Sequence, residues 1–180
     1  MLKTMLLAGA VALTLSASAF AQSDMSAPGG APGASTSTPA YIMAASQSDE
    51  FEIQEGQMAQ SMAKSARVKQ FGAMMVRDHT KTTEALHMGI TKAGMAVPPP
   101  PPLRSDQQQM VTQLQGMTGD DFDRAYIAQQ LPAHQEALML QTSYSRTGDV
   151  KPIRAAAVKA VPTVQEHLNM LQQMQGSMSQ

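Results

Sequence analysis

Apolar side chains recur at three- and four-residue spacing in four long stretches of this 180-residue chain. That spacing places them on one face of an α-helix, so each stretch predicts a long helix with one buried face. The stretches cover roughly residues 41–64, 67–94, 120–147 and 152–175. Aromatic residues make up only 4% of the chain, which argues against a β-sandwich. The chain is therefore predicted to be all-α.

The connections between these stretches predict how the helices pack. The first and the third connection are short, and a short connection makes the two helices that it joins antiparallel neighbours. The second connection is long and contains the proline run Pro98 to Pro102, which predicts a stiff, extended spacer rather than a ligand for a proline-binding domain. Residues 105–116 predict a short helix that caps one end. The expected fold is an antiparallel four-helix bundle with this extra helix in the long connection.

The first 21 residues have the features of a secretory signal peptide. Lys3 precedes an apolar run over residues 5–15, and Ala19-Phe20-Ala21 fits a cleavage site before Gln22. The alternative, an N-terminal membrane anchor, is less favoured because this run is shorter than the ~20 residues of a spanning helix. The chain has no cysteine, so lipoprotein processing is not expected. We expect export to a bacterial periplasm.

Three segments follow the predicted cleavage site. Residues 22–40 are rich in proline, glycine and serine and predict a flexible linker, residues 41–176 form the helical domain, and residues 177–180 form a tail. No later stretch approaches the length of a transmembrane helix. A net charge of −1 gives no basic surface for nucleic acid. Neither a membrane span nor a nucleic-acid partner is expected, and a partner in the cell envelope stays open.

Each predicted long helix carries one ionisable residue on its otherwise apolar face. These residues are Glu55, His79, His134 and His167. A buried glutamate or histidine costs free energy unless it is paired or binds a metal. Counted along the helices from the connecting loops, the four residues lie within about one helical turn of the same height. Their side chains are therefore expected to converge in the core.

Three imidazoles and one carboxylate form a suitable ligand set for a first-row divalent metal, and helix bundles place metals at this depth. Thiolate ligands are excluded because the chain lacks cysteine. We predict that these four residues bind one divalent transition metal: zinc, iron, manganese or copper. Each imidazole also needs a hydrogen-bond acceptor for its second ring nitrogen. The candidates for that role are Asp78, Tyr126, Glu136 and Glu166.

Other interpretations of these residues stay open. The four residues can form a metal-free hydrogen-bond network that fixes the helix register of a structural, stress-related or envelope-interaction protein. A metal with an open coordination position can also activate water or peroxide in an enzyme, but no nucleophile motif supports this and no catalytic residue is assigned. We expect Glu52 to be a solvated charge at the rim rather than another ligand, and His87 to be peripheral. The 16 methionines are interpreted as core filler rather than Cu(I) ligands.

Four segments of the chain carry a family resemblance. They are residues 51–59 (FEIQEGQMA), 68–80 (VKQFGAMMVRDHT), 122–134 (FDRAYIAQQLPAH) and 161–168 (VPTVQEHL). Over about residues 41–175 the chain resembles the exported, ferritin-like bacterial proteins grouped as domain of unknown function 4142. The resemblance implies a ferritin-like four-helix bundle and no established activity. The polar positions that it implies are Glu55, Asp78, His79, His134 and His167.

The chain departs from true ferritins in its ligand pattern. Di-iron bundles use a Glu-x-x-His motif on two helices. Here Val76 and Val164 stand three residues before His79 and His167, so the bridging carboxylates of that motif are missing. Ferroxidase and oxygenase activity are therefore not expected.

Overall fold

The computed structural model describes residues 36–178, and within that range it contains five α-helices and no β-strand. The helices are α1 (Thr38–Met62), α2 (Ala66–Lys92), α3 (Ser105–Gln115), α4 (Gly119–Thr147) and α5 (Lys151–Met178). The all-α prediction is confirmed. The predicted signal peptide, most of the predicted linker and residues 179–180 lie outside the described residues. None of the described helices is both long enough and apolar enough to cross a membrane.

Two helices extend three residues beyond their predicted bounds. α1 begins at Thr38 rather than at Tyr41, and the buried hydroxyl of Thr38 hydrogen-bonds to the Tyr144 hydroxyl and to the Asp149 carboxylate. α5 continues to Met178, into the predicted tail. The tertiary contacts of Thr38 hold a residue that composition alone placed in the flexible linker.

The end of α2 is fixed by a glycine. Gly94 has a φ of 73°, a left-handed conformation that side chains disfavour. The amide of Gly94 donates to the carbonyl of Thr91, and the amide of Met95 donates to the carbonyl of Ile90. This pair of hydrogen bonds satisfies the last carbonyl groups of the helix and turns the chain into the proline-rich connection.

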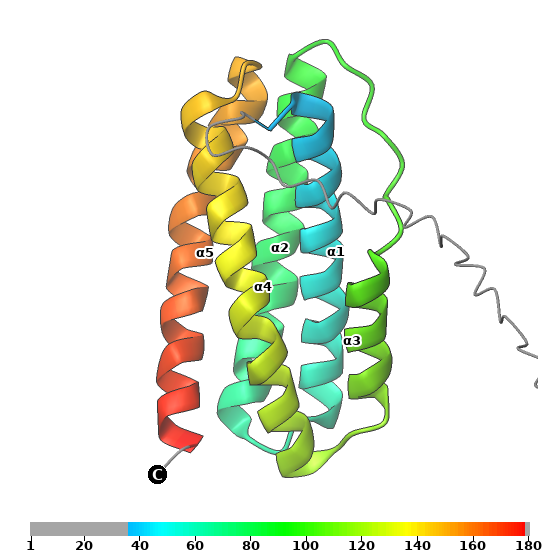
Figure 1. The fold of residues 1–180 in the computed structure, drawn as a ribbon, viewed down its shortest axis with the longest axis vertical. Helices are drawn as coiled ribbons and strands as arrows, with labels where there is room; N and C mark the ends of the chain where they lie inside the picture. Colours follow the sequence, from blue (N-terminus) through cyan, green and yellow to red (C-terminus); the bar gives the residue numbers. More distant parts are fainter. Residues whose placement is uncertain (1–35, 179–180) are drawn as a thin grey trace, which may run out of the picture. The chain divides into compact units, whose positions relative to one another are not determined.

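The four long helices lie side by side (Figure 1). α1 packs against α2 and α4, and α5 packs against the same two helices. Residues 63–65 join α1 to α2, and residues 148–150 join α4 to α5, so each of these pairs is antiparallel. The connection from α2 to α4 runs back along the length of the helices, so α2 and α4 point in the same direction (Figure 1).

α3 lies alongside α1 and also contacts α4 (Figure 1). The prediction that this helix caps an end was wrong. The connection that contains it must travel the length of the long helices, which carries α3 along their side. Its buried residues Val111 and Leu114 are three positions apart and form one stripe, and Leu114 joins the same hydrophobic cluster as Tyr126 and Leu131.

Two glycines let α1 and α2 approach closely. A Cβ atom on Gly72 would lie 2.6 Å from the Cβ of Ala59 and 2.7 Å from the carbonyl oxygen of Gly56. A Cβ atom on Gly56 would lie 2.7 Å from the carbonyl oxygen of Gly72. The two backbones are therefore in contact at Gly56, the residue that follows Glu55. This contact holds the part of α1 that carries the Glu55 carboxylate close to α2.

The core consists of two hydrophobic clusters with a polar layer at their junction. One cluster includes Phe71, Phe122 and Leu171, and the other includes Tyr41 and Ile153. The buried polar residues at the junction are Asp49, Glu52, Glu55, His79, Gln130, His134 and His167. Every long helix contributes to this layer. The buried ionisable residues are thus concentrated between the two hydrophobic clusters.

Methionine side chains lie both in the core and on the surface of the protein. Met75 and Met174 are buried in the core, as the interpretation of methionine as filler predicts. Met43, Met88 and Met139 are instead more than half exposed. The filler interpretation therefore applies to only some of the methionines.

Candidate metal centre

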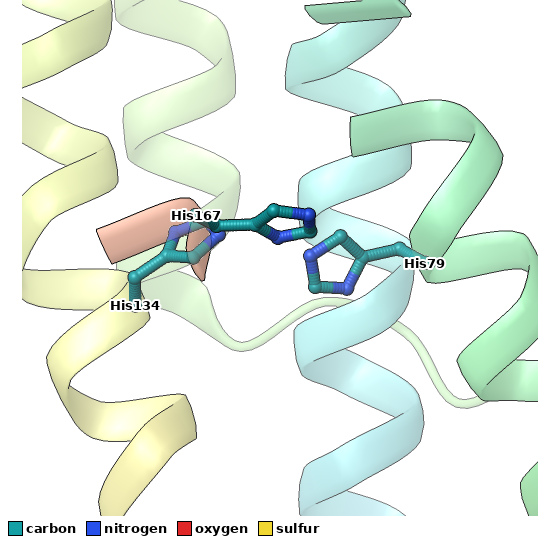
Figure 2. Close-up of side chains that lie close together, drawn as sticks. All are labelled: His79, His134 and His167. Atoms are coloured by element: carbon teal, nitrogen blue, oxygen red, sulfur yellow. The ribbon is translucent and has the colours of Figure 1, made fainter. Parts of the chain in front are cut away.

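Three histidines from three helices converge in the polar layer. His79 on α2, His134 on α4 and His167 on α5 point toward one another (Figure 2). One ring nitrogen from each lies within 4.8 Å of the others, and the ring centroids are 5.4 to 5.7 Å apart. The three residues are 2%, 0% and 1% exposed. The structure thus brings together three of the four predicted ligands in a buried position.

Each of the three rings is anchored through one nitrogen. Nδ1 of His79 lies 2.9 Å from Oδ1 of Asp49, and Nδ1 of His134 lies 3.0 Å from the backbone carbonyl oxygen of Gln130. Nε2 of His167 lies 3.4 Å from Oδ2 of Asp78. Because these partners are acceptors, each anchored nitrogen carries the proton and donates. Each ring therefore keeps a lone pair on its other nitrogen.

The other ring nitrogens have no hydrogen-bond partner among the described residues. These buried atoms are Nε2 of His79, Nε2 of His134 and Nδ1 of His167. A neutral imidazole binds a metal through such a lone pair while its second nitrogen is held by an acceptor. The pattern of anchored and free nitrogens is thus the one that a metal site requires.

Electrostatics keep two of these imidazoles neutral. Burial, reinforced by the neighbouring imidazoles of His79 and His167, lowers the pKa of His134 well below its ordinary value. Burial and the imidazole of His79 lower the pKa of His167 to about 4. Protons therefore do not compete for these nitrogens near neutral pH.

Two of the three anchored nitrogens are held by carboxylates. Asp49 on α1 is 4% exposed and also accepts hydrogen bonds from the hydroxyls of Thr82 and Thr83. Asp78 accepts two hydrogen bonds from Arg77, and these bonds are the main cause that lowers its pKa to about 2. Asp78 is therefore an anion at all ordinary pH values.

Sequence reasoning identified Asp78 but missed Asp49. A signal for it was present, because Asp49, Glu52 and Glu55 follow one another at three-residue intervals in a chain that is only 15% charged. Residues at that spacing share one broad helix face. All three are buried in the structure.

Glu55 is buried beside the histidines but does not belong to the group whose ligand atoms lie within 4.8 Å of one another. Its Oε2 accepts a hydrogen bond of 3.0 Å from Nε2 of Gln130, and its Oε1 has no partner. The same Gln130 anchors His134 through its carbonyl oxygen. Glu55 and the histidine cluster are therefore linked through one residue of α4.

Glu52 is not a solvated charge at the rim, as expected from the sequence, because it is 0% exposed. α1 packs against α2, α3 and α4, so its buried face is wider than one stripe and takes in this residue. Oε1 of Glu52 lies 3.6 Å from Nδ1 of His134. Glu52 therefore lies next to the His134 ring, on the side of its anchored nitrogen Nδ1.

The remaining predicted acceptors do not contact a histidine. Tyr126 is fully buried, and its hydroxyl has no hydrogen-bond partner among the described residues. Glu136 is exposed and pairs with Arg104 instead. Glu166 is exposed, and His87 is half-buried outside the histidine group. Asp78 is the one candidate acceptor that the structure places against a ring.

The buried acids have raised pKa values. Burial and the charge of Glu55 raise the pKa of Glu52 well above its ordinary value. Burial raises the pKa of Glu55 to about 8. Burial and the charges of both glutamates raise the pKa of Tyr126. This part of the polar layer therefore tolerates negative charge poorly in the absence of a cation.

Comparison with known proteins gives one match. A family model described as Domain of unknown function (DUF4142) matches residues 23–174 of the chain. No curated protein and no solved structure gives a significant match.

Proposed function

The chain belongs to the family described as domain of unknown function (DUF4142), a description that names no activity, so we propose its function from the site alone. The protein binds one divalent transition metal through His79, His134 and His167. The observation that carries this proposal is that three buried histidines converge and that each has one ring nitrogen without a hydrogen-bond partner. An unsatisfied buried polar atom costs about 1–3 kcal/mol, and a metal bound to all three would offset that cost.

A metal-free network accounts less well for the same geometry. In such a network, the three rings would hydrogen-bond to one another or to nearby side chains. Instead their N–H groups point away from the centre, to Asp49, Asp78 and the carbonyl oxygen of Gln130. The three remaining nitrogens carry only lone pairs, and lone pairs cannot form hydrogen bonds among themselves. The arrangement therefore favours a cation at the centre.

The donor set narrows the choice of metal. Imidazole nitrogen suits zinc, copper and iron, whereas manganese prefers oxygen ligands. Zinc sites with three protein ligands leave a further position for water or substrate, which keeps a metal-dependent enzyme as an alternative. We assign no catalytic role to any of the described residues. We therefore assign metal binding as the function, with zinc, copper or iron as the metal.

Two wider features belong to the same proposal. The single long crossover between α2 and α4 is the connectivity of ferritin-like four-helix bundles, which supports that architecture for this chain. Export to a periplasm rests on the signal-like sequence of residues 1–21. Together they describe an exported helical protein with a buried metal.

The test measures metal stoichiometry. The purified chain, made without an affinity tag and stripped with a chelator, is dialysed in separate samples against zinc, copper or iron and analysed for bound metal. We expect a tightly bound zinc ion that is lost in His79→Ala and His167→Ala and kept in the matched control His87→Ala. A wild-type chain that binds no zinc, copper or iron would overturn the proposal.

Export has its own test. The chain is expressed with its first 21 residues in a bacterium that has two membranes, and the periplasmic fraction is analysed by mass spectrometry. We expect a periplasmic protein that starts at Gln22. An uncut chain in the cytoplasm would contradict export.

A further inference from the structure

Behind the His134 ring lies a group of buried oxygen atoms that the histidine site does not use. Glu52 and Glu55 come from α1, and Tyr126 and Gln130 come from α4. All four residues are 0% exposed. The oxygens without a hydrogen-bond partner are both carboxyl oxygens of Glu52, Oε1 of Glu55, the Tyr126 hydroxyl and Oε1 of Gln130.

These atoms lie close to one another. Nε2 of Gln130 donates to Glu55, so its side-chain oxygen, which shares a carbon with that nitrogen, is also near this carboxyl group. Tyr126 and Gln130 are four residues apart on α4 and therefore share a face. The charges of Glu52 and Glu55 both act on the Tyr126 hydroxyl. The hydroxyl nevertheless donates a hydrogen bond to neither glutamate.

The carboxyl groups of Glu52 and Glu55 have no positively charged side chain as a partner in the described part of the chain. Among the described residues, no lysine or arginine forms an ion pair with Glu52 or Glu55. The nearest basic group of Glu52 is the neutral His134 ring, at 3.6 Å. Buried carboxylates are ordinarily paired or coordinate a metal. Several convergent oxygens with two acids among them form the kind of donor set that divalent cations such as Mn²⁺, Mg²⁺ and Ca²⁺ prefer.

We propose that Glu52 and Glu55, with the side-chain oxygens of Tyr126 and Gln130, form a second cation site that takes an oxygen-coordinated divalent cation next to the histidine site. The two sites are distinct because Glu52 faces the anchored nitrogen of His134, whereas the lone pair of that ring points into the histidine cluster. The His134 ring thus separates a nitrogen-donor site from an oxygen-donor site.

A groove on the surface lies near the elements that carry this oxygen site. A groove of about 370 Å³ lies between α1, α3 and α4. Its lining includes Phe51 and Ala133, which directly precede Glu52 and His134 in the chain. Arg104, Asp106 and Glu136 line the same groove, so its wall carries both signs of charge. The two elements that carry the acids and the phenol of the oxygen site, α1 and α4, therefore also form walls of this groove.

The test counts cations at the two sites separately. The full chain, untagged and chelator-stripped, is first saturated with Zn²⁺ and then dialysed against Mn²⁺, and both metals are measured per chain. We expect two bound ions in the wild type. The isosteric double variant Glu52→Gln/Glu55→Gln should keep one ion, and His79→Ala/His167→Ala should also keep one. Glu84→Gln, which changes an exposed glutamate on α2, is the matched control and should keep two.

The possible outcomes separate this inference from the proposed function. One ion in the wild type that survives the double glutamate variant would overturn the second site and leave the histidine site intact. One ion that is lost in both double variants would indicate a single shared site and would also overturn the inference. An ion that survives only in the histidine variant would support the oxygen site and contradict the histidine site. Circular dichroism and melting curves establish that each variant is folded, and Glu52→Gln alone is the substitute if the double variant is not.

Discussion

Nδ1 of His79 lies 2.9 Å from Oδ1 of Asp49, and both side chains are almost completely buried. The carboxylate fixes the proton on Nδ1 and so directs the lone pair of Nε2 into the histidine cluster. The hydroxyls of Thr82 and Thr83 donate to the same carboxylate and hold its orientation. Asp49 is therefore a positioning residue for His79, supplied by a helix that contributes no histidine.

Replacing Asp49 with asparagine should weaken metal binding without removing a ligand. Asparagine keeps the shape and one acceptor oxygen but loses the negative charge that holds the Nδ1 proton of His79. Substitutions of such partners typically reduce metal affinity by about 10- to 100-fold. We expect a loss in this range for Asp49→Asn, measured as the zinc dissociation constant in a chelator competition. Asp121→Asn, on an exposed residue of α4, should leave the constant unchanged.

Metal should stabilise the fold through the three histidines. A ligand that binds only the folded state adds about 2.7 kcal/mol of stability at a free concentration 100-fold above its dissociation constant. We expect the melting temperature of the chelator-treated chain to rise as zinc is added. His167→Ala should abolish the rise and His87→Ala should preserve it. An equal rise in both variants would show that zinc stabilises the protein from somewhere else.

Stability of the metal-free chain should fall as the pH increases above neutrality. Burial raises the pKa of Glu55 from 4.5 to about 8, so between these values the folded state holds a proton that the unfolded state has released. Stability therefore decreases with rising pH, by about 1.4 kcal/mol per pH unit for this group, and levels off above its folded pKa. Urea unfolding of wild type and Glu55→Gln from about pH 7 to about pH 8 measures the difference.

His167 does not disturb this comparison. Its pKa is lowered from 6.5 to about 4, so its effect on stability lies in the acidic range, where stability falls as the pH falls. Between about pH 7 and about pH 8, the free energy of unfolding should fall less in the Glu55→Gln variant than in the wild type. Parallel losses in the two proteins would mean that Glu55 does not hold its proton in the folded state.

Gly72→Ala should destabilise the protein by forcing α1 and α2 apart. The added methyl group would meet the Cβ of Ala59 at 2.6 Å and the carbonyl oxygen of Gly56 at 2.7 Å. Overpacking of this kind costs about 1–3 kcal/mol. The expected result is a lower urea midpoint with an unchanged slope. At Gly176 an added Cβ meets nothing within 4 Å, so Gly176→Ala should be neutral or stabilise by up to about 1 kcal/mol.

The helices and the three histidines follow directly from the sequence. Long three- and four-residue periodicity is a strong signal of a helix, and a histidine in each of three stripes stood out against apolar neighbours. The placement of α3 did not follow, because periodicity gives a helix and its buried face but not the surface that the face covers. The extended start of α1 depends on contacts of Thr38 with residues more than 100 positions away.

The partners of the histidines were harder to predict. Glu136 and Glu166 are close to His134 and His167 in sequence, but one or two residues along a helix turn a side chain away from the ring by about 100° or 200°. The real partners come from an adjacent helix, as Asp49 does, or from one turn earlier, as the carbonyl oxygen of Gln130 does. Buried Glu52 was misplaced because one stripe per helix underestimates a face that contacts three other helices.

The distribution of the histidines over the helices has a consequence for how the helices are held together. A metal held by His79, His134 and His167 cross-links α2, α4 and α5, while α1 contributes no histidine to the cluster. α1 contacts the cluster through Asp49, which holds His79, and through Glu52, which lies beside His134, and Glu55 is linked to it through Gln130. Under the proposed function, the metal would join three long helices to one another through coordination bonds, while the fourth would be held to them by packing and hydrogen bonds alone.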